Sequence, residues 1–162
     1  MLSSLTINGG AGIDSVTIDA NLLLPDVDLS INAEMITVNS GVTISTFDGI
    51  ASYGDINFVA NASEIGNFPL NFTVEPSAQI NIVGATIIGG AINFSATATA
   101  TANAMSIEIV SELSPAVIIA KPDASVSISG VSNISSNSDV NSEGSLSVNA
   151  NTIVSTNLQA IS

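Results

Sequence analysis

The sequence predicts an all-β fold, a right-handed parallel β-helix (β-solenoid) of about five or six rungs that residues 1–162 form as a single domain. The first observation is a five-residue phrase that occurs five times: apolar, Ser or Asn, apolar, any residue, Ala or Gly. The second is that apolar and polar residues alternate with a period of two, which is typical of half-buried strands. The third is that no window of helical length carries an apolar stripe at i, i+3, i+4 and i+7.

The spacing of the phrase indicates one turn of the chain per copy. The copies begin 27, 36, 34 and 20 residues apart, at Leu29, Ile56, Ile92, Val126 and Leu146. The two longer intervals require insertions, which we expect around residues 64–69 and 111–115. The alternative fold is an antiparallel β-sandwich, whose short strands also recur, at intervals of about 8–12 residues. The return of one phrase, rather than of generic strands, favours the β-helix.

The expected strands are short segments rich in Val, Ile and Thr. Gly, Asn, Ser and Pro separate them at turns, as in Asn8-Gly9-Gly10 and Pro122-Asp123. In chain order we expect strands at residues 5–7, 16–18, 29–33, 36–38, 42–44, 56–60, 80–82, 92–96, 107–109, 126–128 and 146–150.

Stacking of the phrase predicts two ladders of inward-facing side chains. The first apolar position would form a ladder of Leu29, Ile56, Ile92, Val126 and Leu146. The second would form a ladder of Ile31, Phe58, Phe94, Ile128 and Val148. The fifth position is always Ala or Gly, which indicates a tight corner or close packing between turns, because a larger side chain would clash there.

The charge balance excludes some classes of partner. There are 14 acidic residues and a single basic one, Lys121, so the net charge is −13. Nucleic acid is not expected as a partner, because binding the phosphate backbone requires clustered Lys and Arg. Insertion into a membrane is not expected either, because no stretch of about 18 apolar residues occurs. Cations, above all Ca²⁺, are favoured; the alternative is that the acidic residues keep a sheet-rich protein soluble.

Residue types that carry most catalysis are missing, so we expect no enzymatic activity. The chain has no His and no Cys, the usual general bases and thiol nucleophiles. The alternative is a carboxylate-dependent, polysaccharide-active β-helix enzyme using Asp26 and Asp28, because alternation would place both on one strand face. Such enzymes generally also need basic residues to hold an acidic sugar, and the chain has no Arg.

The most specific local motif is residues 9–17, Gly-Gly-Ala-Gly-Ile-Asp-Ser-Val-Thr. It fits the pattern G-G-x-G-x-D-x-U-x, in which glycines form a tight turn and the Asp offers carboxylate oxygen to Ca²⁺. This segment resembles the repeats of RTX-type secreted bacterial proteins. The resemblance implies a partial Ca²⁺ site at Gly10, Gly12 and Asp14. The alternative is a glycine turn with a solvent-facing Asp.

Residues 95–102 repeat Ala with Ser or Thr and are compatible with a strand. A flat row of Thr resembles ice-binding solenoids, which need Thr at one position on successive turns. The aligned copies of the phrase do not supply such ranks, so we expect a plain strand whose core face carries small residues.

A broader resemblance covers most of the chain. Residues 29–44 read strand, Ala, strand, Gly, strand, and this phrase is similar to one turn of the β-helical regions of large bacterial surface proteins, such as adhesins of the filamentous-haemagglutinin type. The resemblance implies an acidic, structural or adhesive module, secreted or on the bacterial cell surface. Its expected partners are further copies of itself, or glycans and proteins of a cell surface or matrix. A self-assembling fibre subunit is the alternative.

The ends of the sequence lead us to expect a fragment of a longer repeat protein. The start, Met1-Leu2-Ser3-Ser4, has neither the basic region nor the apolar region of a secretory signal. The phrase also recurs close to the last residue, at 146–150.

Overall fold

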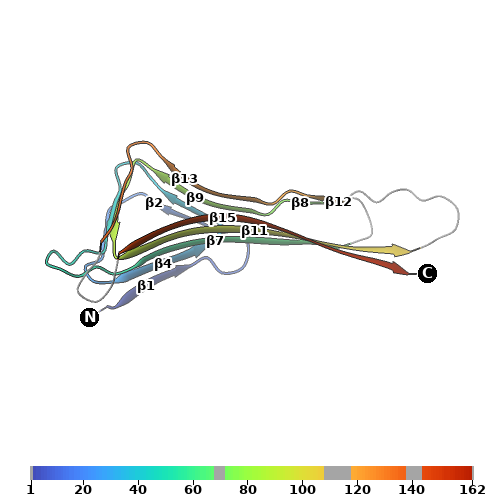
Figure 1. Cartoon of the computed structure of the whole chain (residues 1–162), viewed down its shortest axis with the longest axis horizontal. Helices are drawn as coiled ribbons and strands as arrows, with labels where there is room; N and C mark the ends of the chain where they lie inside the picture. Colours follow the sequence, from blue (N-terminus) through green and yellow to red (C-terminus); the bar gives the residue numbers. More distant parts are fainter. Residues whose placement is uncertain (1, 68–71, 108–117, 138–143, 162) are drawn as a thin grey trace.

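The computed structural model describes residues 2–67, 72–107, 118–137 and 144–161, and within them it is all-β, with no helix. Strands fall into three stacked parallel sheets and a short two-stranded one (Figure 1). The long sheet contains β1 (Ser4–Asn8), β4 (Asp28–Ala33), β7 (Ile56–Asn67), β11 (Ala91–Ile107) and β15 (Ser145–Ile161), in that order.

The other strands complete each turn of the chain. The second sheet contains β2 (Ser15–Ile18), β5 (Met35–Val38), β9 (Ser77–Val83) and β13 (Asp123–Ser129). The third sheet contains β3 (Leu22–Leu23), β6 (Thr43–Ser45), β10 (Thr86–Gly89) and β14 (Asn133–Ser136). The short sheet pairs β8 (Phe72–Val74) with β12 (Ile118–Ala120).

The chain visits the three main sheets in the same order on each turn and returns to the long sheet beside its previous strand. Every ladder between named strands is parallel. This arrangement is consistent with a β-helix. It contradicts the alternative antiparallel sandwich, whose neighbouring strands would run in opposite directions.

Four of the five copies of the phrase lie in register, as predicted. Leu29, Ile56, Ile92 and Leu146 are consecutive partners in the long sheet. The prediction that Val126 and Ile128 belong to these ladders was wrong. Both belong to β13 in the second sheet, where they pair with Ile80 and Ile82 of β9. An apolar–polar–apolar phrase satisfies any strand with one buried face, so the pattern alone does not distinguish the sheets.

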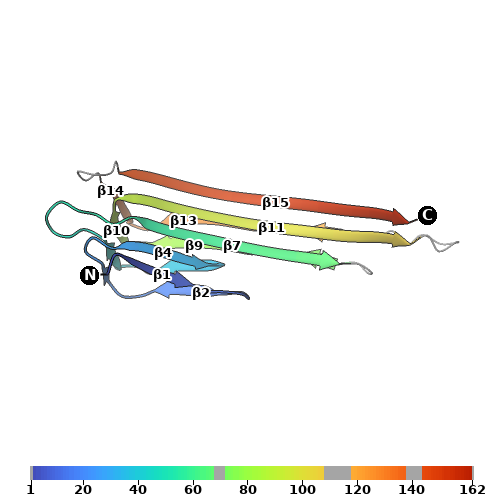
Figure 2. The ribbon, with the colours of Figure 1, turned by 90° about the horizontal axis from the view of Figure 1, so that it is seen from below.

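The first rung of the ladder is Leu5, which pairs with Leu29, so successive partners in the long sheet are 24, 27, 36 and 54 residues apart (29−5, 56−29, 92−56, 146−92). As these intervals increase, the strands of that sheet also lengthen, from 5 residues in β1 to 17 in β11 and β15. Figure 2 shows this widening along the stack. The insertion expected at 64–69 is thus partly strand, since β7 continues to Asn67; the one expected at 111–115 lies outside the described residues.

The core is wide where the turns are complete and thin where the long strands extend beyond them. In the wide part, Phe58 and Phe94 are fully buried, with ring centroids 5.4 Å apart. In the thin part, the long strands approach β8 and β12 (Figure 1), and the buried side chains that the long strands contribute are all alanines. These are Ala60, Ala62, Ala96, Ala98, Ala100 and Ala102. Small side chains on the long strands allow the opposite layer, which includes the buried Val74 of β8, to approach closely.

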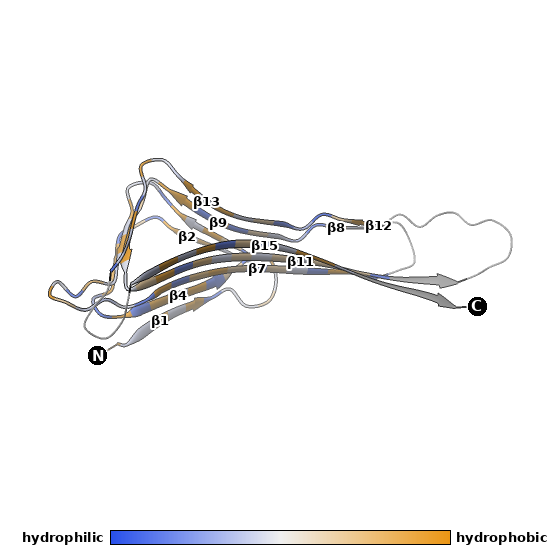
Figure 3. Cartoon of the chain, in the orientation of Figure 1, coloured by the Kyte–Doolittle hydropathy of each residue, from blue (hydrophilic) through white to orange (hydrophobic). Residues whose placement is uncertain are grey.

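The Ala at the fifth position of the phrase therefore has two roles. In β4 it ends the strand at Ala33, whereas in β7 and β11 the strand continues through Ala60 and Ala96. Of the two expected roles, the corner occurs in β4 and close packing occurs in the longer strands. The strand predicted at 95–102 is confirmed, with alanines buried and Thr97, Thr99 and Thr101 partly exposed. Figure 3 shows hydrophobic residues spread along the strands of every turn.

Candidate functional site

The glycine loop after β1 forms a tight turn against the second turn of the chain. Gly10 and Gly12 have φ angles of 96° and 130°, which L side chains rarely adopt. The loop folds back onto Gly9, where an added Cβ would lie 2.6 Å from the Cβ of Asp14. Gly9 donates its N–H to the carbonyl of Asn32 at 2.8 Å, which joins the loop to β4.

Asp14 is half-buried rather than solvent-facing. Its backbone N–H donates to Oε2 of Glu34 at 2.7 Å. Its Oδ2 atom is buried and has no hydrogen-bond partner among the residues that the structure describes. A buried carboxylate oxygen is unfavourable without a partner, so this atom is the point of the loop that a bound cation would stabilise most.

Glu34 is the residue that sequence reasoning missed. It occupies the corner between β4 and β5, one turn above Asp14, because Ser15 and Met35 are partners in the second sheet. The backbone carbonyl of Asp14 accepts from Met35 N–H at 3.0 Å. A sequence alignment of residues 15–18 with residues 35–38 would have placed Asp14 beside Glu34. The five-residue phrase could not reveal this contact, because its copies near this corner lie in the long sheet and not in the second sheet.

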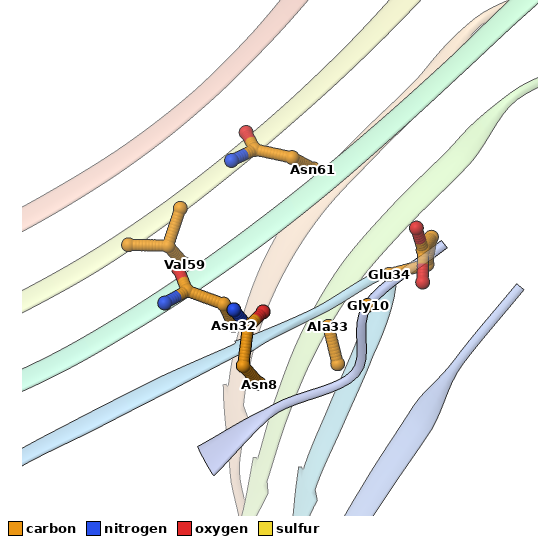
Figure 4. Close-up of a pocket in the computed structure, with 7 residues that line it drawn as sticks. All are labelled: Asn8, Gly10, Asn32, Ala33, Glu34, Val59 and Asn61. Carbon is orange, nitrogen blue, oxygen red and sulfur yellow. The ribbon is translucent and has the colours of Figure 1, made fainter. Parts of the chain in front are cut away.

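A shallow depression of about 300 Å³ lies beside this corner on the outer face of the long sheet. Asn8, Asn32 and Val59 lie together, with Asn61 above them and Glu34 to their right (Figure 4). Asn8 and Asn32 are partners in the ladder between β1 and β4. The depression is therefore lined by amide groups and one carboxylate, groups that bind a cation or the hydroxyls of a saccharide. The residues that line it are Asn8, Gly10, Asn32, Ala33, Glu34, Val59 and Asn61.

The residues at the corner fit Ca²⁺ in part. Ca²⁺ takes about six to eight oxygen ligands. Asp14 and Glu34 offer two carboxylates, and the loop of Gly10 and Gly12 offers backbone carbonyls. Within the described residues, no group of three or more acidic, His or Cys side chains gathers here or elsewhere. A bound Ca²⁺ would thus depend on amide, backbone and water oxygens for most of its ligands.

Asp26 and Asp28 do not share a strand face, contrary to expectation. Asp26 is in a turn with φ of 56°, and its N–H donates to the carbonyl of Thr46 at 2.8 Å. Asp28 begins β4, and its Oδ1 accepts the backbone N–H of Asp55 at 2.8 Å. Asp55 repeats this contact one turn later, accepting the N–H of Ala91 at 2.8 Å. Asp28 therefore joins successive turns, and the reason for pairing it with Asp26 as catalytic groups is removed.

A second candidate site is the loop between β6 and β7, which we call the projecting loop (residues 46–55). It extends away from the stacked sheets in Figures 1 and 2. The rings of Phe47 and Tyr53 stack with centroids 4.7 Å apart, and an antiparallel bridge joins the same two residues. At the base, Thr46 donates its hydroxyl to the carbonyl of Gly54 at 2.6 Å.

The tip of the projecting loop is held by Asp48. Its Oδ1 accepts three backbone N–H groups, from Ile50, Ala51 and Ser52, at 2.7, 2.9 and 3.0 Å. The hydrogen bond from Ile50, followed by that from Ser52, lowers the pKa of Asp48 below its ordinary value of 3.8, because these contacts favour the carboxylate. Ile50 itself is 87% exposed, so a rigid loop presents an aliphatic side chain to solvent.

The outer face of the long sheet is polar and largely without charge. Amide side chains on neighbouring strands donate to one another along it, Asn93 to Asn57 at 2.7 Å and Asn103 to Asn67 at 3.1 Å. Ser or Thr occupies most of the remaining outward positions of β11. Such a face offers hydrogen bonds over a wide area.

Comparisons with known proteins assign no function to the chain, so a functional assignment rests on the physical observations above. The part of the chain that the structure describes contains no helix of the length and hydrophobicity needed to cross a membrane. No known family, no curated protein and no solved structure matches the chain.

Proposed function

We propose that the chain is a segment of a right-handed parallel β-helix of about five rungs that serves as a structural or adhesive module of an extracellular bacterial protein. The observation that supports it most is the parallel register of Leu5, Leu29, Ile56, Ile92 and Leu146 along one sheet. Stacked turns of this kind give a stiff body, because backbone hydrogen bonds run along the stack and the apolar side chains form one continuous core.

The division between core and surface supports a scaffold role. The inward positions are occupied by Ile, Leu, Val, Phe and Ala, and changes there would disturb neighbouring turns. Loops between strands point outward and can vary without altering the stack. The projecting loop is the best example, because its conformation is held by Asp48 and by the Phe47–Tyr53 pair before any partner binds.

We assign adhesion to the projecting loop, with a protein or glycan of a cell surface or matrix as its partner. A loop that is already ordered loses little conformational entropy on binding. Ile50 at the tip would enter an apolar recess, and the aromatic pair would lie along the rim.

Adhesion can be tested with the matched variants Ile50→Ser and Val131→Ser. Both side chains are almost fully exposed, at 87% and 96%, but Val131 lies in the turn between β13 and β14. Beads coated with the chain would be applied to immobilised fibronectin, collagen and an array of neutral and acidic glycans. We expect Ile50→Ser to lower retention about tenfold on the surface that binds, and Val131→Ser to leave it unchanged. Equal loss in both, or no retention by any probe, would refute adhesion through this loop.

The scaffold itself is tested separately by circular dichroism and small-angle scattering. A spectrum dominated by β-structure and an elongated particle are expected. A dominantly helical or unfolded spectrum would eliminate the β-helix, whatever the result for adhesion.

We further propose that Ca²⁺ binds at the corner of Asp14 and Glu34. The support is the buried Oδ2 atom of Asp14 beside a second carboxylate. Calcium chloride should raise the melting temperature relative to EDTA by about 5–10 degrees, the effect of a ligand at about 100 times its dissociation constant. Asp14→Asn and Glu34→Gln should abolish the shift, while Asp19→Asn, an exposed neighbour, should retain it. The same shift in all four proteins would place the effect of Ca²⁺ elsewhere.

A further inference from the structure

The outer face of the long sheet carries asparagine amides that pair with one another across neighbouring strands. Asn93 of β11 donates its amide to Asn57 of β7 at 2.7 Å, and Asn103 donates to Asn67 at 3.1 Å. An amide has two donor hydrogens and one acceptor oxygen, and each pair uses part of this capacity. These four amides therefore take part in the hydrogen bonding of the sheet itself.

The amides that line the depression beside Glu34 differ from these pairs. In the described part of the chain, no hydrogen bond between side chains involves Asn8, Asn32 or Asn61. The next partner after Asn8 and Asn32 along their row is Val59, which has no polar group to continue it. The ladder between β4 and β7 ends at Ala33, before it reaches Asn61. The donors and acceptors of these three amides are therefore available to a ligand.

The depression lies where strands of unequal length are neighbours. β4 ends at Ala33, whereas β7 continues to Asn67. The lining residues Asn32 and Asn61 alternate with buried residues, so both point outward from the sheet. A further turn stacked on β1 would therefore lie beside the depression and not over it.

The chemistry of the lining distinguishes among classes of ligand. The Glu34 carboxylate and the net charge of −13 disfavour an anion. An ammonium group carries only donors and Ca²⁺ takes only oxygen ligands, so neither would use the N–H groups of the three amides. A hydroxyl both donates and accepts, and it can pair with either end of an amide and with a carboxylate. The lining therefore favours a neutral ligand with several hydroxyl groups.

The size and the apolar part of the depression favour a sugar ring. Val59 and Ala33 supply aliphatic surface, and the volume is about 300 Å³, at the lower end of the range for ligand sites. A pyranose ring has C–H groups on its faces and hydroxyls around its rim. One face would lie on Val59 while the rim reaches the amides and Glu34. The space is sufficient for one ring and not for an oligosaccharide.

Glu34 is held in position before a ligand binds. Its Oε2 atom accepts the backbone N–H of Asp14 at 2.7 Å. This contact orients the carboxylate and leaves Oε1 for a hydroxyl of the ligand. A group that is already ordered loses little conformational entropy on binding.

We propose that this depression binds one neutral hexopyranose unit of a glycan. Asn8, Asn32 and Asn61 donate to and accept from its hydroxyls, and Glu34 accepts from one of them. The inference rests on the proposed adhesive module and adds a site separate from the projecting loop, which precedes the start of β7, whereas the depression lies at the end of β4. A single ring of about 12 non-hydrogen atoms in a shallow site should bind with a dissociation constant on the order of 1 mM.

Nuclear magnetic resonance can test the site through the amide groups themselves. The chain would be titrated in EDTA with the methyl glycosides of glucose, mannose, galactose and N-acetylglucosamine, and with glucuronate. At least one neutral glycoside should shift the side-chain NH₂ signals of Asn8, Asn32 and Asn61 at millimolar concentration and leave those of Asn67 and Asn103 unchanged. Glucuronate should bind at least tenfold more weakly. No shift with any neutral glycoside at about 50 mM, or tighter binding of glucuronate, would overturn the proposal.

Matched variants test the assignment of residues. Asn61 and Asn67 lie on the same face of β7 and are both exposed, but they are about 20 Å apart along the strand. Asn61→Ala and Asn32→Ala should each weaken binding about tenfold, while Asn67→Ala should bind as the unmodified chain does. Circular dichroism verifies that each variant keeps its β-structure. An equal loss in Asn67→Ala would contradict the site.

Two further variants separate this site from the other proposals. Asp14→Asn should lose the stabilisation by Ca²⁺ and keep glycoside binding, because its backbone N–H still holds Glu34. Glycoside binding that requires Ca²⁺ and is lost in Asp14→Asn would overturn direct recognition by the amides. Ile50→Ser should bind glycosides normally, so failure of the glycoside site and failure of adhesion through the projecting loop are distinguishable.

Discussion

At the scale of single residues, the turns depend on a few positions where any added atom meets backbone. Gly54 closes the projecting loop and lies against β4, so that an added Cβ would be 2.3 Å from the carbonyl carbon and oxygen of Val27. Gly10 differs, because its positive φ explains the glycine although an added Cβ would have nothing within 4 Å. The two residues are required for different physical reasons, steric exclusion and backbone conformation.

We predict that Gly54→Ala destabilises the chain by about 3 kcal/mol or more, because the backbone of two turns must separate to admit a methyl group. Gly10→Ala should lower the free energy of unfolding by only about 1–2 kcal/mol, the cost of the positive φ. Urea unfolding followed by circular dichroism measures both. Similar values for the two variants would contradict the close contact at Gly54.

At the scale of elements, strand length determines the thickness of the core. Complete turns enclose Phe58 and Phe94, whereas the extensions of β7 and β11 face β8 and β12 across a layer of alanines. Alternation of Ala and Thr over 96–102 showed that this segment is a strand with a small-residue face. It did not show what the face packs against, because that depends on β8 and β12, which were not expected as strands at all.

We predict that Ala98→Leu destabilises the chain by about 1–3 kcal/mol, because Ala98 is fully buried in the thin layer and the sheets would have to move apart. Thr99→Leu adds similar volume at the next residue but points outward, so it should change stability by less than about 0.5 kcal/mol. The measurement is the shift of the thermal midpoint for each variant. If Ala98→Leu were as stable as the parent chain, the thin layer would have space that the structure does not show.

At the scale of the whole molecule, charge is almost entirely of one sign, because 14 acidic residues face a single basic one and the net charge is −13. The one ion pair in the described part of the chain joins Lys121 Nζ to Glu75 Oε1 at 3.3 Å, with both side chains more than half exposed. Such an exposed ion pair contributes little to the free energy of unfolding. Repulsion among the remaining carboxylates therefore opposes the folded state.

We predict that raising sodium chloride from about 10 mM to about 150 mM raises the melting temperature, because the Debye length falls from about 30 Å to about 8 Å. The measurement is a thermal melt in EDTA, which separates screening from any effect of Ca²⁺. A melting temperature that falls or stays constant with salt would contradict net repulsion in the folded state.

The sequence by itself determined that the chain is all-β, where most strands lie, and that copies of the phrase stack in register. These properties follow from alternation and from residue size, which are local. Tertiary structure alone decided that Val126 lies in the second sheet, that the Glu34 carboxylate contacts Asp14, and that Asp26 lies in a turn while Asp28 lies in β4. Each of these depends on which strands share hydrogen bonds, and strands with one buried face carry the same alternation whichever neighbour they pair with.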